Sequence, residues 1–315
     1  MIIGVSGQDG SYLARFLLAK GYQVFGTSRD PMITSFSNLD HFGIRDKVKV
    51  FSASLKDFRS VLNALKLSQP DEVYNLSGQS SVSLSFEQPV ETFESISLGV
   101  LNLLEAVRFL EKDIRLYNAC SSECFGNTGG KRATEKTAFN PRSPYAVAKS
   151  AAFWQVANYR EAYNMFACSG ILFNHESPLR PKRYVSQKIV MTAYRIAQGY
   201  KEKLRLGNIS VCRDWGWAEE YVVAMWLMLQ QSEPADFIIA TGKTHSLQEF
   251  VTHVFAKLNL DWREHTELDT SLLRPTDIEI SQADPLKAEE ILGWSAQYDM
   301  YDVVDKMIEA VKCSH

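Results

Sequence analysis

The order of apolar and polar positions along the chain predicts alternating β-strands and α-helices in its first half. Short apolar runs, each typical of a buried strand, occupy residues 1–5, 22–27, 48–52, 72–76, 114–119 and 167–173. Between them, apolar side chains recur with helical spacing at residues 11–20, 60–67, 92–110 and 145–162. Because strands that alternate with helices form parallel sheets covered on both faces, this half predicts an α/β fold with a doubly wound, Rossmann-type parallel sheet.

The alternation weakens after Asn174, where Pro178 and Pro181 interrupt the chain. One further strand is predicted at 237–241, and helices are predicted at 185–199, 220–231, 246–258, 287–292 and 301–312. We therefore expect residues 1–174 to form a first domain, to which residues 211–244 return. Residues 175–210 and 245–315 are expected to form a smaller C-terminal α/β lobe.

Composition narrows the class of protein. The 315 residues are 45% hydrophobic and 23% charged, as in a soluble globular protein, and their net charge of −3 excludes an overall cationic attraction to nucleic acid or anionic membranes. No apolar run reaches the roughly 18 residues of a membrane span, and no secretory signal is recognised at the start. The five cysteines include no C-x-x-C pair, so we expect reduced thiols, no metal site and a cytoplasmic protein.

A glycine-rich loop follows the first predicted strand and opens the first predicted helix. Its sequence, Gly4-Val5-Ser6-Gly7-Gln8-Asp9-Gly10, has the spacing G-x-x-G-x-x-G. Glycines permit the tight turn and let the backbone approach a pyrophosphate, which lies on the N–H groups at the start of the helix. In this strand–loop–helix context the motif predicts dinucleotide binding by Gly4, Gly7, Gln8, Asp9 and Gly10.

The residues after the second predicted strand bear on which dinucleotide is bound. An acidic residue there accepts a hydrogen bond from the ribose 2′-OH of NAD, whereas an arginine favours the 2′-phosphate of NADP. The sequence reads Thr27-Ser28-Arg29-Asp30, so that Arg29 suits NADP, while Asp30 suits NAD or pairs with Arg29. We expect NADP, with Arg29 among the cofactor residues, and keep NAD as the alternative.

A second group of residues indicates acid–base chemistry. Tyr145 and Lys149 are four residues apart in a predicted helix, which places them on one face. An ammonium beside a phenol lowers the pKa of the phenol, so we expect Tyr145 to act as a base near neutral pH. Ser121 and Glu123 follow the strand predicted at 114–119, at the sheet edge where such folds place reacting groups. Ser121 is expected to bind a substrate hydroxyl, and Glu123 to supply a separate acid–base group.

Longer stretches then suggest a family. They include GVSGQDGSYLA at 4–14, PRSPYAVAK at 141–149, NYREAY at 158–163, GILFNHESPL at 170–179, RDWG at 213–216, YVVAMWLMLQQ at 221–231, ATG at 240–242 and RPTD at 274–277. Together they span almost the whole chain. The chain resembles the GDP-mannose 4,6-dehydratases, a family of extended short-chain dehydrogenases/reductases, and PRSPYAVAK and LFNHESP are specific to that family.

The resemblance implies a set of site residues. Ser121 takes the place of a catalytic threonine, and Glu123, Tyr145 and Lys149 match catalytic positions. His175 and Arg180 fall near the cofactor, and Leu76, at the end of the strand at 72–76, is a further expected cofactor contact. Cys120 stands where serine is usual, and Asp277 replaces a glutamate. The expected nucleotide-sugar contacts are Asn174, Val185, Lys188, Arg213, Arg274 and Asp277.

The reaction that the resemblance implies is oxidation at the sugar C4, elimination of water across C5 and C6, and return of hydride to C6. The substrate is expected to be GDP-mannose or a GDP-manno-heptose, and the assembly a homodimer or homotetramer. A nucleotide-sugar 4-epimerase or 4-ketoreductase is the nearest alternative, because it can use the serine, tyrosine and lysine without Glu123. A non-catalytic dinucleotide sensor is a further alternative, although such a protein has no need of a base for C5.

Overall fold

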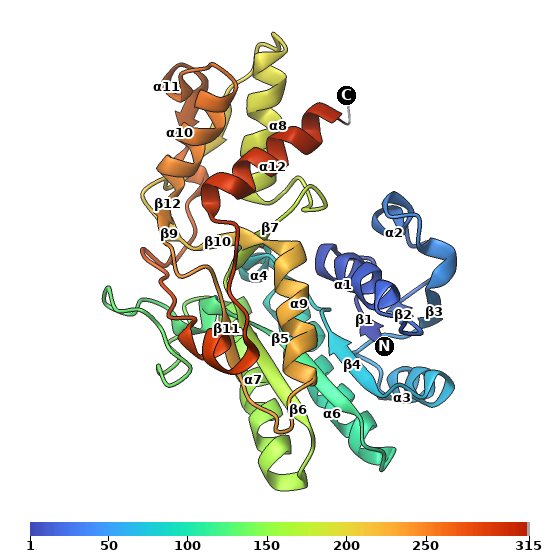
Figure 1. The fold of residues 1–315 in the computed structure, drawn as a ribbon. Helices are drawn as coiled ribbons and strands as arrows, with labels where there is room; N and C mark the ends of the chain where they lie inside the picture. The colour runs from blue at the N-terminus through green and yellow to red at the C-terminus, as the bar shows by residue number, and fades with distance from the viewer. Residues whose placement is uncertain (314–315) are drawn as a thin grey trace.

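The computed structural model of the chain describes residues 1–313 (Figure 1). Its centre is a seven-stranded sheet with the strand order β11-β6-β5-β4-β1-β2-β3, in which every pair of neighbours is parallel. The predicted α/β class is therefore confirmed. The strands are β1 (Ile2–Ile3), β2 (Phe25–Ser28), β3 (Lys49–Ser52), β4 (Glu72–Asn75), β5 (Arg115–Ser121), β6 (Ala167–Leu172) and β11 (Phe237–Ile239).

Helices cover both faces of this sheet, because its central strands bury apolar side chains on both sides. One face packs against α1 (Gln8–Ala19), α2 (Ser37–His41) and α9 (Ala218–Leu229). The other face packs against α3 (Phe58–Ser68), α6 (Gly99–Phe109) and α7 (Pro144–Tyr163). Further helical segments of this half include α4 (Val82–Glu87), α5 (Pro89–Phe93) and the 3₁₀ turns η1 (Arg45–Lys47) and η3 (Ser122–Phe125).

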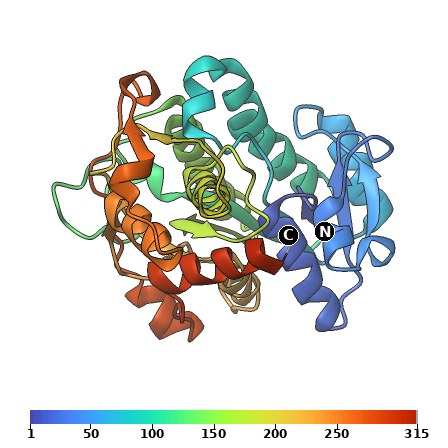
Figure 2. The same cartoon turned by 90° about the horizontal axis from the view of Figure 1, so that it is seen from above.

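A second lobe lies beyond the carboxyl ends of the central strands, at the top of Figure 1. Helices α8 (Val185–Ala197), α10 (Leu247–Lys257) and α12 (Met300–Cys313) share one apolar core there. Seen from above, its orange segments gather on the side opposite the blue N-terminal strands (Figure 2). Short strand pairs complete it, namely β7 (Asn174–Glu176) with β10 (Trp215–Trp217), β9 (Cys212–Arg213) with β12 (His245–Ser246), and β8 (Leu204–Leu206) with β13 (Thr266–Leu268).

The end of the chain contributes smaller elements, α11 (Trp262–His265), the 3₁₀ turn η4 (Thr270–Leu272) and the π-helical turn η5 (Ala288–Leu292). The sequence predicted one helix at 92–110, whereas the structure has α5 and α6 joined by the π-helical turn η2 (Glu94–Leu98). Within residues 1–313, no helix is both long enough and apolar enough to cross a membrane.

Candidate active site

The loop between β1 and α1 has the shape that its glycine spacing predicts. Gly4 has a φ of +89°, and a Cβ at this position would lie 3.1 Å from the backbone of Leu76. A Cβ on Gly10 would overlap the carbonyl oxygen of Gly4, so glycine is needed there for α1 to begin so close to β1. Gly7 is the N-cap of α1 and brings no side chain to its first N–H groups. The loop therefore fits the pyrophosphate of a dinucleotide.

Arg29 and Asp30 follow β2 and are both exposed. The carboxylate of Asp30 accepts a hydrogen bond of 2.9 Å from the backbone N–H of Met32, and its carbonyl accepts one from Thr34. No ion pair found within residues 1–313 joins Asp30 to Arg29. The guanidinium of Arg29 thus remains available to an anionic ligand, while Asp30 stabilises the turn.

Asp9 and His175, which are both expected near the cofactor, form an ion pair with each other. Nε2 of His175 lies 2.9 Å from Oδ2 of Asp9, and Nδ1 of His175 lies 2.7 Å from the carbonyl oxygen of Phe173. Burial raises the pKa of Asp9, but His175 and the neighbouring Gln8 outweigh this effect and bring that pKa to about 2. Burial lowers the pKa of His175, and Asp9 more than offsets it, so the net pKa of His175 is raised.

This pair belongs to a wider buried network that connects the glycine loop to β7. The amide nitrogen of Gln8 donates to Oδ1 of Asp9 and to the carbonyl of His175, at 2.9 Å and 3.2 Å. Its amide oxygen accepts a hydrogen bond of 2.8 Å from the Ser177 hydroxyl. The ring of Tyr221 stacks on His175 with ring centroids 4.6 Å apart. These contacts fix the position of the start of α1 relative to the segment that follows β6.

Arg180 lies in the segment that connects β7 to α8. Its Nε is 3.2 Å from Oε2 of the buried Glu176, and its guanidinium lies 4.0 Å from the ring centroid of Tyr184. The hydroxyl of Tyr184 in turn makes a hydrogen bond of 2.6 Å with that of Ser80, which follows β4. The sequence analysis did not identify Tyr184 or Ser80, because no local pattern indicates a contact between residues 104 positions apart.

Ser121, Tyr145 and Lys149 meet between the end of β5 and the first turns of α7. The Ser143 hydroxyl caps α7 by accepting a hydrogen bond of 3.1 Å from the N–H of Ala146, which fixes Tyr145 in the first turn. All three candidate side chains are buried. Nζ of Lys149 donates a hydrogen bond of 2.7 Å to the carbonyl of Ala119 and lies 5.9 Å from the ring centroid of Tyr145.

The pKa of Tyr145 differs from the expectation drawn from the sequence. Burial is the largest influence and raises the pKa well above its ordinary value, while a hydrogen bond with Ser121 lowers it. The pKa of Lys149 is lowered, also by burial. The expected lowering of the Tyr145 pKa by Lys149 is therefore wrong for the protein groups alone, because desolvation of the phenolate is the largest influence and raises that pKa.

Glu123 lies in η3, two residues after the end of β5. Burial raises the pKa of its carboxyl, and Arg213 and Arg274 offset part of this rise. No hydrogen bond found within residues 1–313 involves its carboxyl oxygens. A desolvated carboxyl with a raised pKa is better suited to take up and release a proton, as a general acid–base group requires.

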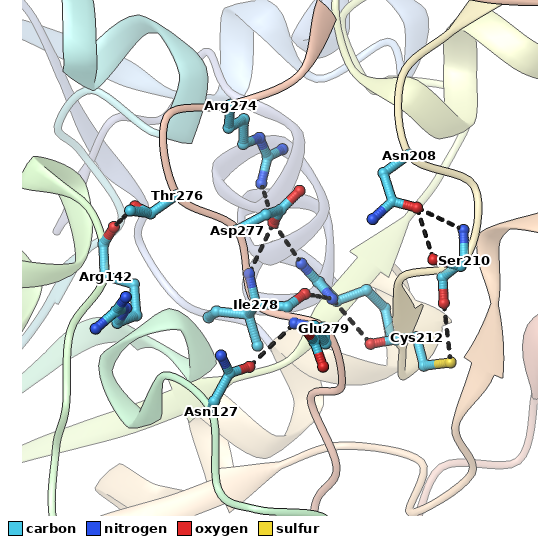
Figure 3. Close-up of polar contacts among 11 residues, drawn as sticks. Asn127, Arg142, Asn208, Ser210, Cys212, Arg274, Thr276, Asp277, Ile278 and Glu279 are labelled. Carbon is cyan, nitrogen blue, oxygen red and sulfur yellow. Dashed lines mark hydrogen bonds and ion pairs between the residues drawn. The ribbon is translucent and has the colours of Figure 1, made fainter. Parts of the chain in front are cut away.

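Two arginines meet at one aspartate beside Glu123: Arg213 is the last residue of β9, and Arg274 and Asp277 lie in the loop after η4. Figure 3 shows Arg274 pointing at Asp277, with Nη1 3.3 Å from Oδ1. Nη2 of the buried Arg213 lies 3.0 Å from the same oxygen, and its Nη1 donates to the carbonyl of Ile278 at 2.7 Å. The three side chains carry one net positive charge, which suits a diphosphate better than a neutral sugar.

The other expected substrate residues lie on the lobe around this group. Asn174 is the first residue of β7, and Val185 is the half-exposed first residue of α8. Lys188, one turn into α8, donates a hydrogen bond of 2.6 Å to the carbonyl of Arg205. Burial and the adjacent Arg205 lower the pKa of Lys188. Arg205 adds a cation that the sequence analysis did not identify, and it pairs with Asp269 at 2.7 Å.

Comparison with known proteins decides the family. A family model described as GDP-mannose 4,6 dehydratase matches residues 1–307. GDP-mannose 4,6 dehydratase 1 of Arabidopsis thaliana is 44% identical over 319 aligned residues, which cover 98% of this chain and 88% of the relative. The chain belongs to the GDP-mannose 4,6-dehydratase family. The resemblance inferred from the sequence motifs and the enzyme class, a hydro-lyase, are thereby confirmed, and the family match favours a dehydratase over the epimerase and ketoreductase alternatives.

Solved structures show the same fold. UDP-glucose 4-epimerase of Thermus thermophilus, solved with NAD, is 26% identical and superposes with a TM-score of 0.83 over 97% of both chains. RMD of Pseudomonas aeruginosa, solved with NADPH, is 20% identical and superposes with a TM-score of 0.81 over 100% of this chain and 99% of that one. Together with the glycine loop, these neighbours support a nicotinamide dinucleotide as the class of cofactor.

Proposed function

We propose that the chain converts GDP-mannose to the GDP-4-keto-6-deoxy sugar, as a nucleotide-sugar 4,6-dehydratase. The observation that carries this proposal is the partly buried, desolvated carboxyl of Glu123, whose pKa is raised, beside the buried group formed by Ser121, Tyr145 and Lys149. Elimination across C5 and C6 needs a base for the C5 proton and an acid for the C6 oxygen. One carboxyl serves both steps, because its two protonation states act in sequence.

At C4, Tyr145 accepts the hydroxyl proton while Ser121 orients that hydroxyl. The hydrogen bond between Ser121 and Tyr145 favours the phenolate and thus supports this role. A bound nicotinamide dinucleotide would supply the hydride acceptor for C4 and the hydride donor for C6. The ketone at C4 acidifies the C5 proton, which Glu123 removes and then delivers to the departing C6 hydroxyl.

The glycine loop, with Gly4, Gly7 and Gly10, would hold the pyrophosphate of the cofactor. Arg29 supports NADP rather than NAD, because it is exposed at the end of β2 and its neighbour Asp30 is engaged by Met32. Mass spectrometry of the nucleotide released on denaturation tests this choice. NADP is the expected result, together with weaker binding of NADP, and not of NAD, by the Arg29→Ala variant. NAD alone in the released fraction would show that Arg29 does not select the cofactor.

The direct test of the proposed function is incubation with GDP-mannose and analysis of the product. A dehydratase yields a ketone that has lost one water, and in heavy water the product carries deuterium at C5. A 4-epimerase or 4-ketoreductase yields a sugar that retains its C6 oxygen. Recovery of such a product, without loss of water, would contradict the proposal and restore the alternative.

We also propose that at least two copies of the chain associate through α5, η2, α6 and α7. These helices lie against one another, yet leave large apolar side chains in solvent, with Trp154 62% and Leu98 44% exposed. Phe93 and Val147 extend this surface. An exposed apolar surface of this kind is unfavourable in water. A second copy of the chain can cover it with its own copies of the same helices.

Light scattering at micromolar concentration tests the association. A dimer or tetramer is expected for the unchanged chain, and Trp154→Glu is expected to dissociate it by placing a charge in the apolar surface. Tyr200→Glu is the matched control, since Tyr200 is 64% exposed and lies in the segment that follows α8, outside the proposed surface. A monomer for the unchanged chain would contradict the proposal.

A further inference from the structure

Two cysteines flank the segment that holds Ser121 and Glu123. Cys120 is the next-to-last residue of β5, and Cys124 lies in η3, immediately after Glu123. Their Sγ atoms are 3.7 Å apart, which is van der Waals contact, and the side chains are 3% and 0% exposed. Neither thiol has a part in the reaction proposed above.

The other three cysteines differ from this pair. Sγ of Cys168 contacts the carbonyl of Leu116, that of Cys212 contacts the carbonyl of Ser210, and Cys313 is exposed near the end of α12. Among residues 1–313, Cys120 and Cys124 are the only two thiols found in contact with each other. By the family resemblance serine is usual at position 120, and here the residue is Cys120.

We propose that Cys120 and Cys124 form a redox-modification site, at which a peroxide produces a disulfide that inactivates the enzyme and a thiol restores it. The two sulfur atoms are already in contact, and only three residues lie between the two cysteines in the sequence. The site needs no other subunit or metal.

The chemistry begins at Cys124. Burial raises the pKa of this thiol, but hydrogen bonds with Cys120 and Ser150 and the charge of Lys149 bring it below its ordinary value. Burial raises the pKa of Cys120 well above its ordinary value, so Cys124 is the nucleophile of the pair. Its thiolate attacks one oxygen of hydrogen peroxide, which breaks the O–O bond, forms a sulfenic acid and releases hydroxide.

The second step closes the disulfide. The sulfur of Cys120 attacks the sulfenic sulfur of Cys124, the S–O bond breaks, and the oxygen leaves as water. Overall, two thiols and one hydrogen peroxide give one disulfide and two waters. The two thiols lose two electrons, and the peroxide accepts them.

Disulfide formation must move the residues between the two cysteines. A disulfide holds its sulfur atoms about 2.05 Å apart, so the 3.7 Å contact has to shorten by more than an ångström. The three intervening residues include Ser121, whose hydroxyl accepts a hydrogen bond of 3.3 Å from the N–H of Glu123. A shift of about 1 Å in reacting groups lowers a rate by roughly 100-fold, and we expect a loss of this size.

The chemical test does not depend on the proposed function. The protein is treated with hydrogen peroxide, its remaining thiols are blocked, and it is digested with trypsin, which releases residues 116–131 with both cysteines in one peptide. A disulfide lowers the mass of this peptide by about 2 Da, the two hydrogens removed. Further cleavage after Glu123 leaves the two fragments joined until a reductant is added.

Variants separate this pair from the other thiols. Cys120→Ser and Cys124→Ala are expected to keep activity after peroxide treatment, whereas the control Cys212→Ser/Cys313→Ser is expected to lose it as the unchanged chain does. Dithiothreitol should restore activity in the unchanged chain and in the control. Fragments that separate without reductant, or equal peroxide sensitivity of Cys120→Ser and the unchanged chain, would overturn the proposal. If the disulfide forms but no dehydratase activity is found before oxidation, the proposed function fails and the redox site stands.

Discussion

Two partly buried carboxyl groups belong to the candidate active site, and their surroundings give them opposite properties. Asp9, at the start of α1, is surrounded by His175 and Gln8, and its pKa falls to about 2. Glu123, after β5, loses water to a similar degree, but its nearest cations, Arg213 and Arg274, are bound to Asp277. Its pKa is raised instead.

The difference shows that desolvation alone does not determine the pKa or the role of a carboxyl group. Asp9 is held as a permanent anion, which fixes His175 and joins the glycine loop to the second lobe. Burial disfavours the charged form of Glu123, which is unfavourable for folding but suits proton transfer. The region around Asp9 is therefore expected to be important mainly for stability, and the region around Glu123 mainly for rate.

The largest expected effect is the loss of activity on replacing Glu123 with glutamine. Gln keeps the shape of the side chain but cannot exchange the C5 proton, so formation of the 4-keto-6-deoxy product should fall by about 10²–10⁴-fold. Oxidation at C4 should continue, because it needs only Ser121, Tyr145 and Lys149. The measurements are product formation and deuterium incorporation at C5 in heavy water.

A matched variant gives the contrast within the same site. Tyr145→Phe should abolish the C4 step itself, and with it the C5 exchange that depends on the ketone. Incorporation of deuterium at the unchanged rate in Glu123→Gln would show that another group removes the C5 proton.

Asp9→Asn should have the next largest effect, on stability. Removing the charge leaves the buried His175 without its counter-ion, so the free energy of unfolding should fall by about 3 kcal/mol. Urea unfolding followed by circular dichroism measures the change. Asp30→Asn is the control, because Asp30 is exposed and its contact with the Met32 N–H survives in asparagine, so the change there should stay within about 0.5 kcal/mol. If Asp9→Asn and Asp30→Asn lost the same free energy of unfolding, the ion pair of Asp9 would have no special importance for stability.

The pH dependence of stability should show the same ion pair. The pKa of Asp9 is about 2 in the folded chain against an ordinary value of 3.8, so its contribution is present above pH 3.8 and is lost as the pH falls toward 2. The size of this loss is about 2 kcal/mol. His175 has a raised pKa, so its contribution is present below 6.5 and is lost as the pH rises through the raised value. Both dependences should be absent from Asp9→Asn.

The sequence predicted the elements around Glu123 better than the contacts of Asp9. The run at 114–119 corresponds to β5, and the helix predicted at 145–162 corresponds to α7, because apolar periodicity and the Ser143-Pro144 start are local signals. These two elements bring Ser121, Tyr145 and Lys149 together. The positions of these candidates could thus be inferred before the fold was known.

The ion pair of Asp9 could not be inferred in this way. His175 is 166 residues away, on a three-residue strand whose partner, β10, is also short and distant in sequence. Such pairings leave no periodic pattern, and the same holds for the meeting of Arg213 with Asp277. The pKa of Tyr145 was inferred with the wrong sign, because sequence spacing reveals the neighbouring Lys149 but not the extent of burial.

The smallest expected effect is also the sharpest test of the comparison between Asp9 and Glu123. Replacing the carboxyl with an amide should lower the free energy of unfolding at Asp9 but raise it at Glu123. The folded chain raises the pKa of Glu123, so its charge opposes folding increasingly as the pH rises from 4.5 through that raised value. Glu123→Gln removes this opposition, and its free energy of unfolding at pH 8 should exceed that of the unchanged chain. The gain should vanish at pH 4, where Glu123 is protonated. A loss of stability at pH 8, like that expected for Asp9→Asn, would mean that Glu123 is a structural anion and not a group held for proton transfer.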